Sequence, residues 1–427
     1  MKRTLLSLVL GLGCLTSFSQ NPFHHCGTDE VQKRAFAKQP ELQIIDDEIE
    51  AFTAQYTSLQ ANSKKTRATI YRIPIVVHVI HNGESVGSGA NISVAQITSQ
   101  IAVLNKDYRL KNTDSLPTSH AFWGYTDDCE IEFCLATMSP QGTPTSGIDR
   151  FDYNQADYDY NDIESIIKPN TIWDRTKYLN IWVVTLGGTA SSLLGYATPP
   201  ASASTDNDGV VIRTTSFGTS GNVANPYHKG RTATHEIGHY LNLKHIWGDD
   251  GSACTGTDNV SDTPNQADEN YGCPSFPNVS CSNGPNGEMY MNYMDYVDDM
   301  CMKMFTTGQK TRMRAVLASG GARSSLTSST GCNWPVGLQE RNEGSVLSIF
   351  PNPSSNHFYI KNSIDFSADF SIEVYNALGQ NMSSQISMSK QANHLIAVKA
   401  DGLPNGTYFV TIQSNSKQST KSLTIIK

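Results

Sequence analysis

The chain of 427 residues carries little positive charge and few long apolar runs. Its 32 Lys and Arg residues stand against 40 Asp and Glu, which gives a formal net charge of -8 at pH 7. Nucleic-acid binding needs clustered Lys and Arg to neutralise phosphates, so this composition argues against nucleic acid as a partner. Beyond the first twenty residues, no apolar run approaches the roughly 20 residues of a membrane-spanning helix, and we expect no transmembrane segment.

The sequence also lacks a C-x-x-C pair, an internal repeat and a low-complexity tract. Residues 1–19 have a basic start, an apolar run and small residues before Gln20, a pattern typical of a secretory signal peptide. Removing this signal leaves eight of the nine cysteines. An even number of cysteines in an exported chain favours disulfides over thiolate metal sites.

The remaining chain changes character at several points. Residues 20–66 are polar, contain one predicted helix around Ile44–Tyr56 and end in the basic "NSKKTRAT", which is typical of a removable pro-segment. In residues 67–325, the β-branched run "RIPIVVHVIH" predicts a buried strand and "ISVAQITSQIAVLNKDYRL" has helical spacing. Further short strands follow, so we expect a mixed sheet flanked by helices.

The periodicity stops between Trp247 and Asp299, where Asp, Asn, Gly, Pro and four cysteines dominate. A long irregular stretch inside a compact domain is usually functional or held by crosslinks. After a linker at 326–346, residues 347–427 alternate short strands with tight turns, and this pattern predicts a small β-sandwich.

The stretch "HEIGHYLNLKH" places three histidines and one glutamate within eleven residues. On a helix, His235 and His239 project from one face and can bind a single ion, while Glu236 can contact a ligand of that ion. His245 can join them only if the chain leaves the helix and turns back. Asn242 suits that turn because asparagine tolerates positive φ. The alternative to a metal site is a helix that carries solvated or core histidines.

The pattern HExxHxxxxxH resembles the zinc-binding signature of the metzincin metallopeptidases, with Asn242 at the usual glycine position. Downstream, "MNYMDYVDDMCM" resembles their methionine turn, with Met294 beneath the metal and Tyr296 two residues later. Residues 68–320 resemble the ulilysin-like members of the pappalysin family. This resemblance implies an α+β metzincin catalytic domain with a mixed twisted sheet, an active-site helix and an irregular, disulfide-linked C-terminal subdomain.

The resemblance implies a secreted zinc endopeptidase. Zinc would be bound by His235, His239 and His245, and Glu236 would act as the general base and acid. Tyr296 would help to stabilise the oxyanion of the transition state. The alternative for Tyr296 is a tyrosine that only packs under the turn, with its hydroxyl satisfied.

The four cysteines of the irregular region match the spacing in the pappalysin family. The resemblance implies the pairs Cys254–Cys281 and Cys273–Cys301, whereas parity alone leaves three connectivities open. Between the first two of these cysteines lies "TGTDNVSDTP". There the family binds calcium, at positions matched by Asp258 and Thr263, and the carbonyl of Ser261 could complete the shell. The alternative is an Asx turn without metal.

Asp299 stands where the family places an acid at the floor of the S1′ pocket, which receives the residue after the scissile bond. A buried carboxylate would select Arg or Lys there. Asp298 is the alternative, as is a solvated acidic face. This specificity would also allow the chain to cut itself before Lys64, Lys65 or Arg67, at the end of the pro-segment.

The pro-segment motif "HHCGTDE" resembles the latency segment of metzincin zymogens. A thiolate at Cys26 could occupy the fourth zinc position and exclude water. Cys26 could equally form a disulfide with Cys332 in the linker. The sequence does not assign partners to Cys129 and Cys134, which would face opposite ways on a straight strand.

The motifs "SIFPNPSSN", "YNALGQ" and "LPNGTYFVTI" resemble the C-terminal domain recognised by the type IX secretion machinery. We therefore expect a secreted or cell-surface protein, with that machinery and protein or peptide substrates as its partners. The rival hypothesis is a surface adhesin on an inactive protease scaffold. The intact Glu236 argues against it, since a structural zinc site needs no general base.

Overall fold

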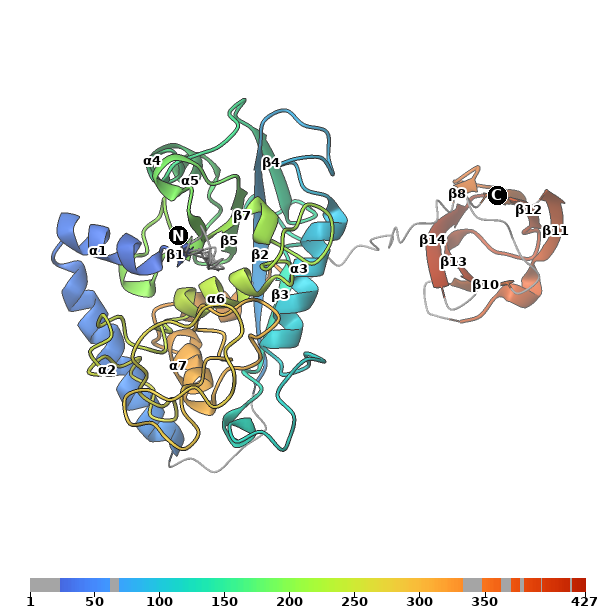
Figure 1. Ribbon diagram of the computed structural model, residues 1–427. Helices are drawn as coiled ribbons and strands as arrows, with labels where there is room; N and C mark the ends of the chain where they lie inside the picture. The colour runs from blue at the N-terminus through green and yellow to red at the C-terminus, as the bar shows by residue number, and fades with distance from the viewer. Residues whose placement is uncertain are drawn as a thin grey trace, which may run out of the picture. The chain divides into compact units, whose positions relative to one another are not determined.

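The computed structural model describes residues 24–61, 69–332, 348–361, 370–376, 380–392, 394–414 and 417–427. The chain forms two compact units, Met1–Asn333 and Trp334–Lys427, each described by itself (Figure 1). The predicted signal peptide at 1–19, the predicted self-cleavage sites and the end of the predicted linker lie outside the described residues.

The first unit contains a seven-stranded mixed sheet with the strand order β1-β6-β7-β5-β2-β3, and β4 also pairs with β2 (Figure 1). All pairs are parallel except β6 with β7. The central strand β2 has eight consecutive buried residues, as its continuous apolar sequence predicts. The strands are β1 His24–Cys26, β2 Tyr71–His81, β3 Ile131–Leu135, β4 Ile148–Asp152, β5 Leu179–Val184, β6 Leu193–Ala197 and β7 Val210–Arg213.

Strand β1 belongs to the predicted pro-segment and covers the edge strand β6. The two strands are parallel, with His24 opposite Leu193 and Cys26 opposite Gly195. An uncovered edge strand offers unpaired N–H and C=O groups to any extended peptide. The predicted pro-segment therefore occupies the place on this sheet edge where another extended chain could pair.

Helices α1, α3 and α6 contact strands of this sheet, and α2 lies beside α7 (Figure 1). The sequence predicted one helix before residue 62, whereas the structure has two, α1 and α2. The longer helices are α1 Thr28–Lys38, α2 Leu42–Ala61, α3 Val94–Asp107, α6 Arg231–Tyr240 and α7 Thr307–Leu317. The short ones are α4 Tyr160–Asp162, α5 Lys168–Thr171, the π-turn η2 Ile163–Ile167, and the 3₁₀ turns η1 Trp123–Tyr125, η3 Gly188–Ala190, η4 Pro200–Ser202, η5 Thr214–Ser216 and η6 Ser324–Ser328.

Two helix starts follow directly from the sequence. Ser93 caps α3 by accepting a hydrogen bond from the backbone N–H of Gln96. Thr306 and Gln309 form a reciprocal capping box at α7. The main core of the unit joins sheet residues such as Val77 to the helices and to the irregular region, which together position the site.

Disulfides hold the irregular region together. The bonds are Cys254–Cys281 and Cys273–Cys301, the pairing that the pappalysin resemblance implies. A third bond joins Cys134 of β3 to Cys332. Cys26 and Cys129 are buried and free. The alternative bond from Cys26 to Cys332 is therefore wrong, because β1 carries Cys26 to β6 while Cys332 lies beside β3.

The second unit consists of two antiparallel sheets with the strand orders β10-β13-β14 and β11-β12-β9-β8. Both sheets contribute to one apolar core, with Phe358 and Val398 from one and Val374 and Val410 from the other. This is the small β-sandwich that the sequence predicted. Its elements are β8 Ser348–Phe350, β9 His357–Lys361, β10 Phe370–Asn376, η7 Ser383–Gln385, β11 Ser387–Ala392, β12 Leu395–Lys399, β13 Gly406–Ser414 and β14 Lys417–Ile425. Within the described residues, no helix combines the length and apolar character that crossing a membrane requires.

Candidate active site

The helix α6 and the turn after it bring the three histidines together. His235 and His239 lie on one face of α6, and the helix ends at Tyr240. Asn242 has a φ of 74°, the left-handed conformation that reverses the chain. The turn is closed by a hydrogen bond from the N–H of Leu243 to the carbonyl of Gly238, and it returns His245 to the helix face.

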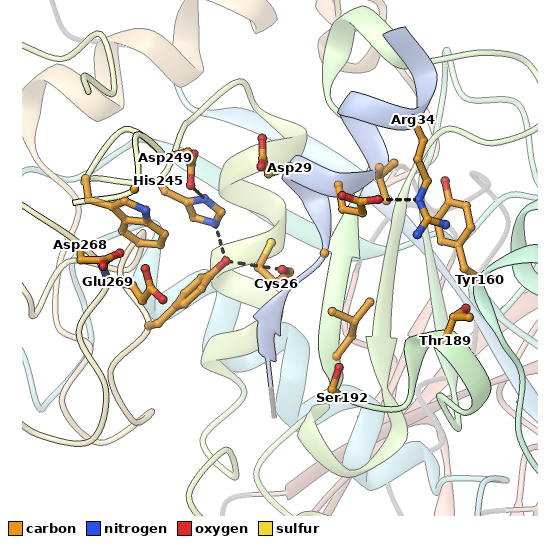
Figure 2. A pocket seen from close by; sticks show the side chains of 17 residues that line it. Cys26, Asp29, Arg34, Tyr160, Thr189, Ser192, His245, Asp249, Asp268 and Glu269 are labelled. Atoms are coloured by element: carbon orange, nitrogen blue, oxygen red, sulfur yellow. Dashed lines mark hydrogen bonds and ion pairs between the residues drawn. The ribbon is translucent and has the colours of Figure 1, made fainter. Parts of the chain in front are cut away.

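The Nε2 atoms of the three imidazoles converge on one point, which is called the metal point below. Nε2 of His239 lies 3.0 Å from Nε2 of His235 and 3.1 Å from Nε2 of His245. Together with Sγ of Cys26, these ligand atoms all lie within 4.8 Å of one another, and all four residues are buried. Figure 2 shows the side chains of Cys26 and His245 close to each other at the edge of a cavity.

The hydrogen bonds of the other ring nitrogens fix the tautomers. Nδ1 of His235 contacts the carbonyl oxygen of Tyr293 at 2.7 Å, and Nδ1 of His239 contacts that of Leu243 at 2.9 Å. Nδ1 of His245 lies 2.7 Å from Oδ1 of Asp249. Carbonyl and carboxylate oxygens only accept, so each Nδ1 carries the proton.

The three Nε2 lone pairs therefore face one another without a proton between them, which is repulsive unless a cation lies among them. Tetrahedral zinc with Zn–N distances of about 2.0–2.1 Å places its ligand atoms roughly 3.3 Å apart, close to the observed spacing. The donor set and its outer hydrogen bonds thus fit zinc.

Met294 lies directly beneath the helix that carries the histidines. Its side chain is fully buried, and a Cβ placed on Gly238 would come within 2.5 Å of its Sδ. Glycine at position 238 is therefore what allows the methionine turn to approach α6. The N–H of Ile246 also donates to the carbonyl of Met294, at 3.3 Å, which ties this turn to the residue after His245.

Tyr296 contacts the third histidine. Its hydroxyl lies 3.0 Å from Nε2 of His245 and 3.5 Å from the carbonyl oxygen of Cys26, as the dashed lines in Figure 2 show. The indole of Trp247 stacks on the imidazole of His245, with centroids 4.4 Å apart and planes 8° apart. The structure thus places Tyr296 at the metal point itself rather than only under the turn.

The carboxylate of Glu236 faces the same point and is held by the predicted pro-segment. Its Oε2 accepts hydrogen bonds from Oγ1 of Thr28 at 2.9 Å and from Sγ of Cys26 at 3.3 Å. Its Oε1 is buried without a hydrogen-bond partner among the described residues. Burial raises the pKa of Glu236 to about 8, against the hydrogen bonds from Thr28 and Cys26, which favour the ionised form.

A cavity of about 440 Å³ lies next to this point, beside the start of α1 (Figure 2). On one side it is lined by Asp249, Asp268, Glu269 and Tyr296, and on the other by Tyr160 and neighbouring residues. The predicted pro-segment contributes its own wall, from Cys26 to Arg34. The predicted pro-segment therefore forms part of the wall of this cavity beside His245.

Asp299 lines a small second pocket together with His235 and Glu236. Its side chain is 1% exposed, and its Oδ2 accepts hydrogen bonds from the backbone N–H groups of Lys229 at 2.7 Å and Arg231 at 3.3 Å. Burial raises its pKa to about 6. Asp298 is partly exposed and lies outside this pocket, so the geometry favours Asp299 as the pocket acid.

The structure also brings Asp258 and Thr263 together. Oγ1 of Thr263 lies 2.9 Å from Oδ1 and 3.0 Å from Oδ2 of Asp258, and the N–H of Val260 donates to Oδ1 in an Asx turn. Burial raises the pKa of Asp258 to about 7. Ser261 is exposed. The Asx turn is present, and calcium binding at this loop stays a prediction.

Sequence reasoning missed three residues that contact the site. Asp249 stands four residues after His245, and this spacing was the only signal for its contact with the ring. Thr28 lies within the motif "HHCGTDE", but nothing local indicates its contact with Glu236, which lies more than two hundred positions away. Trp247 gave no local signal, because it acts by stacking.

Comparisons with known proteins agree with this geometry. Residues 161–318 match the peptidase family described as Pregnancy-associated plasma protein-A, and residues 348–427 match the secretion system C-terminal sorting domain. An extracellular metalloprotease of Pyricularia oryzae is 30% identical over 300 residues, which span 68% of this chain and 90% of the relative. The chain belongs to the pappalysin family of metallopeptidases.

This pappalysin is also similar to solved structures. Promirolysin of Tannerella forsythia is 40% identical with a TM-score of 0.62, over 71% of this chain and 97% of that one. Mature mirolysin of Tannerella forsythia, in complex with a cleaved peptide, is 46% identical with a TM-score of 0.57, over 61% and 97%. The chain is thus a zinc metalloendopeptidase that acts on proteins, and its sorting domain assigns it to the cell surface or the exterior.

Proposed function

We propose that this pappalysin is made as a zymogen and cleaves proteins before Arg or Lys. His235, His239 and His245 would hold the zinc, as their convergent, unprotonated Nε2 atoms support. The segment order would be signal peptide 1–19, pro-segment 20–66, catalytic domain 67–325, linker 326–346 and sorting domain 347–427, the last read by the type IX secretion machinery.

When bound, zinc supplies Lewis acidity toward the scissile carbonyl and lowers the pKa of water to about 7. Glu236 takes the proton of the attacking water and delivers it to the leaving amine, and its free Oε1 supports this role. The hydroxyl of Tyr296 donates to the oxygen that becomes negative in the transition state. Met294 supports the floor of the site without contacting substrate.

The buried carboxylate of Asp299, in a pocket shared with His235 and Glu236, carries the proposed specificity. Among the described residues it forms no ion pair, so a cationic side chain entering the pocket could pair with it directly. Arginine fits best, because its planar guanidinium can bind a carboxylate with two hydrogen bonds.

Latency would come from the pro-segment. Sγ of Cys26 lies within 4.8 Å of the ligand atoms of the three histidines, and Cys26 and Thr28 donate hydrogen bonds to Glu236. With the pro-segment in place, water and substrate are kept from the site, and release of β1 exposes the edge of β6 to substrate. The loop from Asp258 through Ser261 to Thr263 would bind calcium and stabilise the region beside the site.

A peptide library tests the proposed specificity. The matured protein is incubated with peptides of mixed sequence, and the cut positions are mapped by mass spectrometry. We expect Arg, and more weakly Lys, directly after the scissile bond. A map dominated by bulky apolar residues at that position would rule out the role proposed for Asp299.

A further inference from the structure

The pro-segment helix α2 presents one carboxylate to three separate parts of the catalytic unit. Arg312 of α7 donates to both oxygens of Glu50, one of them at 2.8 Å. Nδ2 of Asn259 donates to Oε2 at 3.0 Å, and Nδ2 of Asn242 lies 3.5 Å from Oε1. Nζ of Lys244 is 3.9 Å away.

These partners form a preorganised site for a carboxylate. The Arg312 side chain is 3% exposed, and its Nε donates to the carbonyl of Asn242 at 2.6 Å, which fixes the direction of the guanidinium. Burial alone would raise the pKa of Glu50, but the hydrogen bonds and charge of Arg312 outweigh it and lower that pKa below its ordinary value. A bidentate ion pair between arginine and a carboxylate is among the strongest ion pairs in proteins.

The rest of the helix face supports the same contact. Ile49 packs against the main core, and Thr53 is buried on the catalytic unit. Phe52 lies beside Gly320, and Tyr56 interacts with Arg314 of α7. These positions recur at helical spacing, so α2 docks as an amphipathic helix with Glu50 at the edge of its buried face.

This contact is separate from the zinc point. The partners of Glu50 lie in the turn after α6, in the loop that contains Asn259 and in α7, whereas Cys26 and Thr28 reach Glu236 from β1 and α1. The pro-segment therefore has two attachments, and a cut between residues 62 and 68 breaks neither of them.

We propose that the catalytic unit carries a carboxylate-binding surface formed by Arg312, Asn259 and Asn242, whose occupant is helix α2 of its own pro-segment through Glu50. The severed pro-segment then stays bound, and activation requires its dissociation or destruction as well as the cut. The inference rests on the proposed function in taking residues 20–66 as a pro-segment.

The test uses the full chain with Glu236→Ala and Cys26→Ala, so that it neither processes itself nor binds through the thiol. Three versions are compared: Glu50 intact, Glu50→Gln, and Glu48→Gln as a matched control on the same helix. A trace of trypsin makes the cut, because α2 contains no Lys or Arg. Size-exclusion chromatography with mass spectrometry then follows the α2 fragment.

We expect the α2 fragment to co-elute with the catalytic unit in the Glu50 and Glu48→Gln chains. Glu50→Gln should weaken retention on the order of 10- to 100-fold, because it removes the charge from a partly buried ion pair. Equal retention of the Glu50 and Glu50→Gln fragments would overturn the proposal, and so would equal loss in Glu48→Gln.

Folding and latency are checked independently. Thermal melts of the uncut chains establish that each variant folds, and Glu50→Asp, which keeps the charge on a shorter side chain, should give intermediate retention. If an uncut chain with Glu236 and Cys26 intact is already active, the proposed latency fails. The retention of the α2 fragment can still be interpreted in that case, because trypsin rather than the protein makes the cut.

Discussion

Glu236 is the residue on which the proposed chemistry depends. Its carboxylate faces the metal point but is not among the converging ligand atoms, which come from the histidines and Cys26. Glu236→Ala should therefore keep the fold and the bound zinc while losing at least about 10²-fold in turnover, the low end for a lost general base. Zinc content by atomic absorption and hydrolysis of a protein substrate, measured on the same sample, check both parts. Parental turnover in this variant would contradict the mechanism.

Asp299 is the residue that should set specificity. Asp299→Ala should lower kcat/KM for cuts before Arg or Lys by about 2–5 kcal/mol, the cost of removing one partner of a buried charge pair. Cleavage before neutral residues is the internal control and should change little. An equal loss on both substrate classes would show that Asp299 supports the fold around Lys229 and Arg231 instead of binding substrate.

The same carboxyl gives a pH dependence of defined sign. Burial raises the pKa of Asp299 to about 6 in the folded chain, above the value of about 3.9 in unfolded chains. The folded state then binds more protons between these values, so this contribution to the free energy of unfolding is complete below about pH 4 and is lost as the pH rises through about 6. Melting curves from pH 4 to 7 should show a smaller decline in Asp299→Asn than in the parent. Parallel curves would count against the shift.

At the scale of the local segment, we predict that the loop from Asp258 to Thr263 binds calcium. The carboxylate of Asp258 accepts hydrogen bonds only from neutral donors in the loop. Burial raises its pKa to about 7, against these hydrogen bonds and the charge of Arg312. Calcium added to stripped protein should raise stability by about 2.7 kcal/mol at a hundredfold excess over Kd. Asp258→Asn should abolish this gain. Coincident melting curves with and without calcium in the parent would remove calcium from the proposal.

The turn after α6 shows why a departure from a motif can be harmless. Glycine is the usual residue for a left-handed turn, and Asn242 adopts that conformation with a φ of 74°. Its side chain and carbonyl then bind Glu50 and Arg312, contacts of which a glycine could provide only the second. Asparagine thus completes the turn and adds a contact to helix α2 of the predicted pro-segment.

At the scale of the whole molecule, the proposed pro-segment and the sorting domain belong to different units. If Cys26 occupies the fourth position of the metal site, as proposed, Cys26→Ala should speed maturation because that position becomes open to water. The appearance of the shortened chain over time measures this, and Glu48→Gln serves as a pro-segment variant that should mature at the parental rate. In Glu236→Ala zymogen, Cys26 should titrate as a free thiol after zinc is removed. A disulfide at Cys26 in that protein would eliminate the cysteine switch.

Among the described residues, those that form the candidate active site belong to the first unit. All residues that line the two site pockets or converge at the metal point lie in the first unit. The sandwich matches a sorting domain, which is a module for export rather than for catalysis. The division of the chain therefore agrees with a division of function between hydrolysis and transport.

The sequence by itself determined the parts that depend on local pattern. The spacing of His235, Glu236 and His239 required one helix face, and the apolar run of β2 required a buried strand. The alternating strands after residue 347 required a sandwich. In each case the periodicity of the helix or strand decides which side chains share a surface. The order of apolar and polar residues in the sequence shows that periodicity.

Only the tertiary structure decided which distant groups meet. Cys26 joins the histidines because β1 pairs with β6, and Cys332 bonds with Cys134 because the chain returns to β3. Glu50 reaches Arg312 across 262 positions. Such contacts depend on how sheet and helices pack in three dimensions, and no spacing along the chain encodes them.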